Sequence, residues 1–210
     1  MGRRLCGPLR FWSASSRDRT LSSRALQQWE KTAGTALNEI EVAHRAIVGR
    51  GRGRQFATLQ VNHAYAVLLS SQFQAFSRSL HSEAVDFLAT APAEAWPGGM
   101  LRVLMTRGRK LDYGNPNPGN LGADFSRIGM PFWEHIRRGD KRAEARQRRL
   151  EELNDWRNAI AHQDWDKVGG NPSLRIATVR RWRSTCSALA RTFDRAVHAY
   201  LLSVVGRTPW

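Results

Sequence analysis

The chain has 210 residues, a length that suits one domain of moderate size with a substantial buried core. Its 33 basic and 18 acidic residues give a formal net charge of +15 at pH 7. A charge of this sign and size favours an acidic polymer as the partner, with nucleic acid preferred over a membrane surface.

Arginine accounts for most of this charge. Only four of the 33 basic residues are lysines, namely Lys31, Lys110, Lys141 and Lys167, so 29 are arginines. A guanidinium group makes forked contacts with phosphate, whereas an ammonium group acts as a point charge. A GC-rich genome also raises the arginine content of a protein, and in that case the charge is merely solvated.

The sequence indicates a reducing compartment and no metal site. The two cysteines, Cys6 and Cys186, are far apart, and neither has a histidine or cysteine at ligand spacing. No stretch approaches the roughly 18 apolar residues of a membrane span, and the first residues lack the apolar run of a signal peptide. We therefore expect a cytoplasmic protein with no metal, no cofactor and no membrane partner.

The first half of the chain predicts two helices. Residues 1–20 are basic, rich in serine and aperiodic, as is typical of a flexible tail. Apolar residues then recur every three or four positions from Leu21 to Val48, which predicts a helix. The segment Gly49–Arg54 interrupts this pattern, either as a solvated turn or as a basic link that touches phosphate. An unbroken apolar stripe predicts a long second helix over residues 55–90.

The middle of the chain is richer in turn residues. Prolines and glycines over residues 91–99 end the second helix, and a short helix is expected through Leu101–Leu104. The segment Tyr113–Asn120 reads as a loop, because each residue before a proline is steered away from the helical conformation. Such a loop either lies over a site or only connects two elements. Helix is expected again near Pro131.

The last third predicts two more helices, separated by a loop over Gln163–Pro172. The first runs from Lys141 to about His162, and the second from Ser173 to Val205, where the apolar periodicity is clearest. No alternating pattern typical of strands occurs. We therefore predict an all-α fold, a helical bundle of about four to five long helices, with residues 21–206 as a single domain and residues 207–210 as a C-terminal tail.

One segment, Leu153–His162 (LNDWRNAIAH), suggests a chemical function, because it combines Arg157, Asn158 and His162. Arginine and histidine at this spacing are weak evidence alone, since roughly 0.8 such pairs are expected by chance in so arginine-rich a chain. Requiring asparagine directly after the arginine lowers the expectation to about 0.03. The pair Arg191 and His198 lacks the asparagine and falls within the final apolar stripe, so we treat it as a chance match.

These three residue types suit RNA cleavage without a metal. A histidine can accept or donate a proton at neutral pH, which is the predicted role of His162. Arg157 can hold the phosphate oxygens and stabilise the charge that develops during the reaction. Asn158 can orient His162 or the ribose, or can simply cap the local backbone. Three arginines that precede the motif are predicted to bind RNA: Arg142, Arg146 and Arg149.

Each site residue also has a purely structural interpretation. His162 can interact with the helix dipole, and Arg157 can form a surface ion pair with Glu152 or Asp155. Trp165 can stack on a base or fill the core. Three polar residues of the second helix can likewise line a site or simply form hydrogen bonds: His63, Gln74 and His81.

Helix geometry favours a twofold dimer. Asn158 and His162 lie four positions apart and share a helix face, whereas Arg157 is rotated by about 140° from His162. One helix does not easily close such a site, and a second copy of the motif can supply what is missing.

The segment Leu153–His162 resembles the signature of the HEPN superfamily, an arginine followed by four to six residues and a histidine, commonly with asparagine after the arginine. The resemblance extends more weakly to the helix Val61–Phe87 and to the closing helix Ser173–Val205. It implies a helical bundle that dimerises and places two motifs in one cleft. In many members this is a metal-independent endoribonuclease, often a toxin of toxin–antitoxin or phage-defence systems.

Two functions from different classes follow from this resemblance. The first is a metal-independent endoribonuclease, acting on RNA as a homodimer and restrained by an antitoxin or another regulatory protein. The alternative is a non-catalytic HEPN-like module that binds RNA or a protein. A purely structural helical dimer is a third, weaker interpretation.

Overall fold

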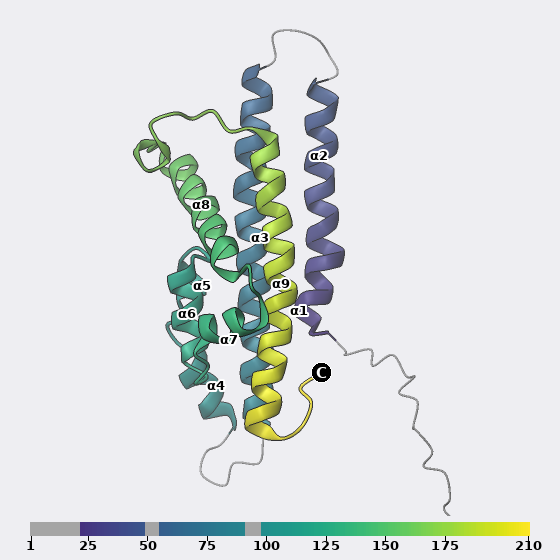
Figure 1. The fold of residues 1–210 in the computed structure, drawn as a ribbon, viewed down its shortest axis with the longest axis vertical. Coiled ribbons are helices and arrows are strands. Elements are labelled where there is room, and N and C mark those ends of the chain that lie inside the picture. Colours follow the sequence, from purple (N-terminus) through teal and green to yellow (C-terminus); the bar gives the residue numbers. More distant parts are fainter. Residues whose placement is uncertain (1–21, 49–54, 91–97) are drawn as a thin grey trace, which may run out of the picture.

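The computed structural model describes residues 22–48, 55–90 and 98–210, and within these ranges the chain forms helices and no strands (Figure 1). The all-α prediction is therefore confirmed for this part of the chain. The expected tail of residues 1–20 and the basic link of residues 49–54 lie outside the described residues. No helix in the described ranges has the length and apolar character that a membrane crossing requires.

The first helical stretch is continuous but changes its winding. It comprises α1 (Arg24–Gln28), a π-helical turn (Trp29–Ala33) and α2 (Gly34–Val48). The sequence pattern predicted the helix but not the π-helical turn. That turn carries the buried indole of Trp29 into the centre of the molecule.

The start of α1 is well capped. The hydroxyl oxygen of Ser23 accepts a hydrogen bond from the N–H of Leu26 at 3.0 Å. The carboxylate of Glu83, from α3 (Gln55–Ala89), accepts from the N–H groups of Arg24 and Ala25 at 3.0 and 2.7 Å. These bonds satisfy donors that a helix start leaves unpaired, and they fix α1 against its neighbour.

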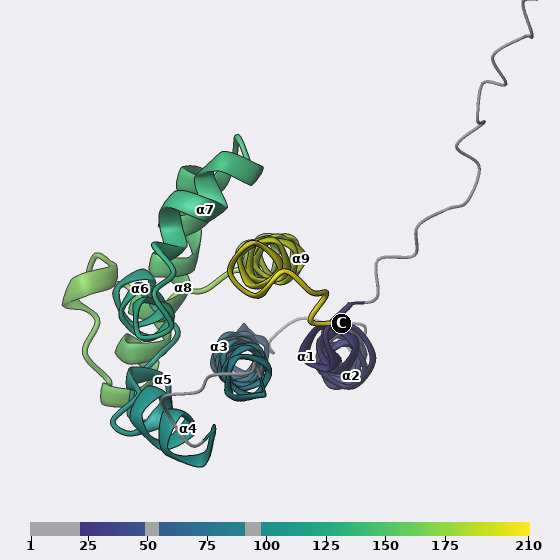
Figure 2. The same ribbon diagram turned by 90° about the horizontal axis from the view of Figure 1, so that it is seen from below.

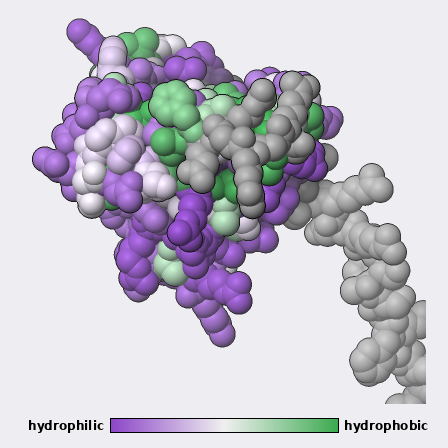
Figure 3. Space-filling view, turned by 90° about the horizontal axis from the view of Figure 1, so that it is seen from above, coloured by the Kyte–Doolittle hydropathy of each residue, from purple (hydrophilic) through white to green (hydrophobic). Residues whose placement is uncertain are grey.

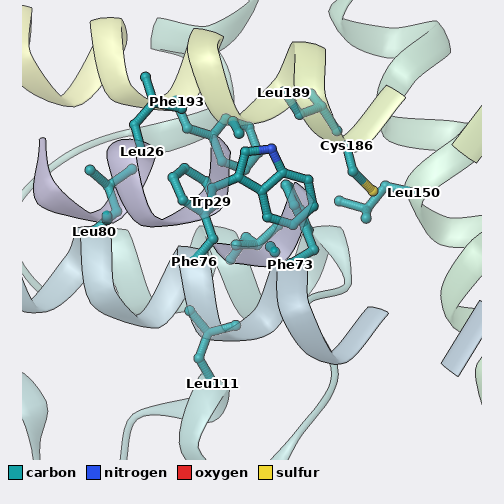
Figure 4. Packing of buried hydrophobic residues seen from close by; sticks show 14 of the residues in the cluster. Leu26, Trp29, Phe73, Phe76, Leu80, Leu111, Leu150, Cys186, Leu189 and Phe193 are labelled. Carbon is teal, nitrogen blue, oxygen red and sulfur yellow. The ribbon is translucent and has the colours of Figure 1, made fainter. Parts of the chain in front are cut away.

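Helices α3 (Gln55–Ala89) and α9 (Ile176–Val205) form the centre of the bundle, with α1 and α2 on one side and the remaining helices on the other (Figures 1 and 2). Aromatic rings fill the space between them. The ring of Phe73 lies 5.7 Å from Trp29, edge to face, and 5.8 Å from Phe193 of α9 (Figure 4). Burial of such rings supplies much of the folding free energy.

Four short helices precede α8: α4 (Gly98–Thr106), α5 (Lys110–Tyr113), α6 (Pro118–Ser126) and α7 (Phe132–Gly139). The first three pack beside α3, whereas α7 packs mainly against α9 and α6. Helices α5 and α6 were not predicted, so the expected count of four to five long helices describes only part of the bundle. Helix α6 forms because Pro118 suits a first turn and the side chain of Asn117 accepts from the N–H of Asn120 at 2.8 Å.

Asp124 joins these short helices to α3. Its buried carboxylate accepts hydrogen bonds from the N–H groups of Lys110 and Leu111, both at 2.7 Å. Its backbone oxygen accepts from Nε2 of the fully buried His81 at 2.9 Å. The guanidinium of Arg109 completes this cluster, donating to the hydroxyl of Ser82 at 2.8 Å.

Helix α8 (Ala143–His162) carries the predicted motif and runs obliquely to α3 and α9 (Figure 1). Leu150 and Leu153 form its buried stripe, as the periodicity predicted. The helix ends at Gln163, which adopts the left-handed conformation (φ 54°). A loop with a short 3₁₀ turn, Asp166–Val168, then leads to α9.

The last residues pack back onto the bundle. Arg207 lies over the ring of Phe87, 4.8 Å from its centroid, and donates a hydrogen bond to the hydroxyl of Thr90 at 2.9 Å. The ring of Trp210 approaches His198 at 5.8 Å. Residues 207–210 are thus in contact with α3 and α9.

Stability should fall in mild acid because of His81. Burial, followed by the nearby charge of Arg109, lowers the pKa of His81 to about 4 from its ordinary 6.5. Between pH 6.5 and 4 the unfolded chain binds one proton more at this residue than the folded chain. The stabilisation is therefore complete above pH 6.5 and is lost as the pH falls to about 4.

The variant His81→Gln keeps an N–H donor and cannot titrate. Urea unfolding from pH 4 to 7 should show its pH dependence reduced, relative to wild type, by up to ~1.4 kcal/mol per pH unit, the slope of one proton. Identical pH dependence of the two proteins would show that His81 does not contribute.

Candidate functional site

The three motif residues occupy the last turns of α8, and two of them are joined. The side-chain oxygen of Asn158 accepts a hydrogen bond from Nη1 of Arg157 at 3.3 Å. The same oxygen accepts from the side-chain amide of Asn115, which belongs to the loop between α5 and α6. Arg157 and Asn158 are half-buried. The guanidinium and both amides therefore form one connected cluster.

His162 lies apart from this cluster. It is exposed and is the last residue of α8, so it is free to meet a ligand and is also placed to interact with the helix dipole. Among the described residues, no hydrogen bond or ion pair links it to Arg157 or Asn158. The regular helix sets Arg157 about 140° around the axis from His162. Within one chain, the histidine therefore does not lie against the arginine and asparagine.

The predicted structural alternative for Arg157 was a surface ion pair with Glu152 or Asp155. Within the described ranges it makes no ion pair with Glu152 or Asp155. Glu152 instead accepts a hydrogen bond from the indole N–H of Trp182 at 2.9 Å. No carboxylate of the described residues therefore lies within ion-pair distance of Arg157.

A second contact fixes the same loop to α8 one turn earlier. Asn154 is buried, and its amide donates to the backbone oxygens of Leu150 at 2.7 Å and Pro116 at 3.3 Å. Its side-chain oxygen accepts from the hydroxyl of Ser70 on α3 at 3.2 Å. The loop is therefore held at two levels of α8, through Pro116 and through Asn115.

Sequence reasoning missed the roles of Asn115 and Asn154. The turn-dense segment was considered as a loop that lies over a site, but nothing in its sequence identified α8 as its partner. The structure also places Tyr113 next to this cluster in the chain, with its side chain largely exposed. An exposed aromatic ring is a surface on which a base can stack.

Trp165 packs against other aromatic rings, and these rings together form an aromatic wedge of His63, Trp156, Trp165 and Trp182. It stacks on His63 of α3 with ring centroids 5.3 Å apart. Trp156 packs between Trp165 and Trp182, 6.3 Å from each. This wedge fills the space between the oblique end of α8 and the central helices.

The polar residues of α3 that were weighed as site candidates all have structural partners. Nε2 of His63 donates to the backbone oxygen of Pro172 at 2.7 Å. The side-chain amide of Gln74 donates to the backbone oxygen of Leu111 at 2.8 Å. His81 belongs to the Asp124 cluster. Arg191 of α9, which belongs to the chance match with His198, also has a partner: it donates to the carboxylate of Glu30 at 2.9 Å.

The three arginines predicted to bind RNA line one groove between α8 and α9, with a volume of about 540 Å³. Arg142 and Arg149 are exposed, whereas Arg146 is ion-paired with Asp140. The structure adds Arg181 from α9, which sequence reasoning did not include.

The end of the bundle at which α8 stops differs in character from the groove (Figure 1). Where α2 ends and α3 begins, hydrophobic side chains gather among hydrophilic ones (Figure 3). Val48 and Phe56 are the exposed large apolar residues there. No group of three or more potential metal ligands occurs among the described residues.

Comparison with protein-family models, with curated proteins and with solved structures gives no match. The chemistry of the chain's own residues is thus the basis for a function.

The amide pair of Asn115 and Asn158 should be measurable as a coupling. In urea unfolding, Asn115→Ala and Asn158→Ala should each destabilise the protein by about 1 kcal/mol. The double variant should lose less than the sum, with an interaction energy of at least ~0.5 kcal/mol. Strictly additive losses would mean that the two side chains do not interact.

Proposed function

We propose that the chain is a metal-independent endoribonuclease of the HEPN type. The observation that carries the proposal is the arrangement at the end of α8. Arg157 pairs with no carboxylate of the described residues and donates a hydrogen bond to Asn158, while His162 is exposed one turn beyond. This arrangement supplies a phosphate-binding cation and a proton-transfer group on one helix end.

Each residue has a defined role in the proposed reaction. The ribose 2′-oxygen attacks phosphorus, the bond from phosphorus to the 5′-oxygen breaks, and the 2′ proton passes to a base while the 5′-oxygen gains a proton. His162 moves a proton, and Arg157 holds the non-bridging oxygens as negative charge builds up. Asn158 positions the guanidinium. The products are a 2′,3′-cyclic phosphate and a 5′-hydroxyl, so DNA is not cut.

Two proton transfers are needed, and each chain offers one histidine at this site. A homodimer that brings two ends of α8 together supplies both, which supports the dimer proposal. The exposed apolar residues Met100, Val103 and Leu104 of α4 lie at the opposite end of the bundle (Figure 1). A dimer formed through them leaves the two motifs apart, so the proposed dimer uses the end where α8 stops.

A second candidate is supported by a different observation. The arginine groove between α8 and α9 can hold nucleic acid whether or not the motif is active. In this alternative the chain is a non-catalytic HEPN-like module that binds RNA. The resemblance also supports a role as a toxin-antitoxin or phage-defence effector, restrained in the cell by a partner protein.

The test is cleavage of labelled RNA in EDTA by wild type and by Arg157→Ala and His162→Ala. We expect EDTA-resistant cleavage by wild type, leaving cyclic phosphate ends, and a loss of about 10²-fold or more in each variant. DNA of the same sequence should remain intact. Arg191→Ala is the matched control, since it removes an arginine of the chance match and should cut like wild type.

Two results decide against the enzyme. If His162→Ala cuts as fast as wild type, the motif is not catalytic. If wild type binds RNA but does not cut it, the binding module is the better description.

A further inference from the structure

The groove between α8 and α9 has two basic walls. Arg146 and Arg149 come from the first turns of α8, and Arg142 is the residue directly before this helix. Spacings of four and three residues place them on the same side. Arg181 faces them from α9, together with the hydroxyl residues Ser184 and Thr185. The described residues that line the groove include no carboxylate.

Most of this charge has no partner within the protein. The side chains of Arg142, Arg149 and Arg181 make no ion pair or hydrogen bond with another described residue, and all three are exposed. Arg146 is held by Asp140, whose carboxylate also accepts from the N–H of Arg142 at 2.8 Å. Three free guanidinium groups around one groove are therefore available for an anion.

The groove suits a backbone of phosphates rather than bases. Arg142 and Arg149 are seven residues apart, about 10 Å along the helix, so the groove spans more than one phosphate. Guanidinium groups and hydroxyls both donate to phosphate oxygens. No aromatic ring lines the groove among the described residues, so nothing there offers a stacking surface for a base.

The groove is separated from the candidate site. His162 lies 13 residues after Arg149, about 20 Å farther along the axis of α8 and about 140° around it. The face of α8 near His162 also carries two carboxylates, Glu151 and Asp155, four positions apart. Phosphates held by the arginines are thus remote from the histidine of the same chain.

We propose that this groove is an RNA-binding exosite that holds the phosphodiester backbone without regard to base sequence, with Arg181 as its second wall. The choice of RNA rests on the proposed function. The exosite holds RNA at a distance from the residues that cut it, so it contributes affinity and not chemistry.

The test measures binding of a fluorescent 2′-O-methyl RNA by anisotropy over a range of salt concentrations. This RNA lacks the attacking hydroxyl, so binding is read without cleavage. Arg149→Ala and Arg181→Ala should each weaken binding about tenfold. Each should also make the slope of log affinity against log salt less steep by about 0.7. DNA of the same sequence should show the same losses.

Arg148→Ala is the matched control. Arg148 is an exposed arginine beside Arg149 on the same helix, but it does not line the groove. Its removal should change affinity by less than about twofold, since only distributed charge is lost. An equal loss in Arg148→Ala and Arg149→Ala would overturn the exosite in favour of general surface charge.

Binding of polyglutamate of matched length tests whether the groove takes a nucleic acid or an acidic polypeptide. If it binds as tightly as RNA and depends on the same arginines, the groove is a site for an acidic polypeptide and the proposal is wrong. Binding of 2′-O-methyl RNA that depends on Arg149 and Arg181, in a protein that cuts no RNA, supports the exosite and refutes the nuclease.

Discussion

Helix α3 is packed on several sides at once, and the positions of the other helices depend on this burial. Its aromatic side chains meet Trp29 on one side and Phe193 on another, while His81 reaches the Asp124 cluster on a third. A helix in this position must pair its buried polar groups as well as bury its apolar ones, because an unpaired polar group in the interior is costly. The pairs that result select one arrangement of the surrounding elements.

Buried hydrogen bonds also fix the positions of the candidate site residues. Ser70 on α3 holds Asn154 on α8, and Asn154 in turn holds the loop at Pro116. One turn farther along α8, Asn115 of that loop reaches Asn158. The anchored part of the site, with Arg157, is thus rigidly connected to the core. His162 lies beyond this support at the end of the helix, where its side chain is exposed.

Positive and negative side chains are segregated along α8. Its early turns present free arginines toward α9, and its later turns carry carboxylates near the face of His162. A polyanion is attracted to the first region and is repelled by the second unless Arg157 compensates. In the proposed function, holding a nucleic acid and cleaving it therefore depend on different parts of this helix.

The helices could largely be predicted from the sequence, because apolar periodicity over a long segment reports directly on a buried face. Helices α3, α8 and α9 begin and end close to the predicted residues. Helix α6 was missed because its capping residues, Asn117 and Pro118, occur in a run that is equally typical of loops. The π-helical turn at Trp29 has no periodic signature, and packing of the indole against Phe73 accompanies it.

The sequence alone determined the all-α class, the basic character and the presence of an arginine, asparagine and histidine on one helix. Local spacing suffices for these features, since a helix repeats every 3.6 residues. Only the tertiary structure decided that Asn115 belongs to the site, that Trp165 is part of an aromatic wedge and that Arg181 completes the arginine groove. Each of these depends on residues far apart in the chain, whose proximity is set by packing and by the pairing of buried polar groups.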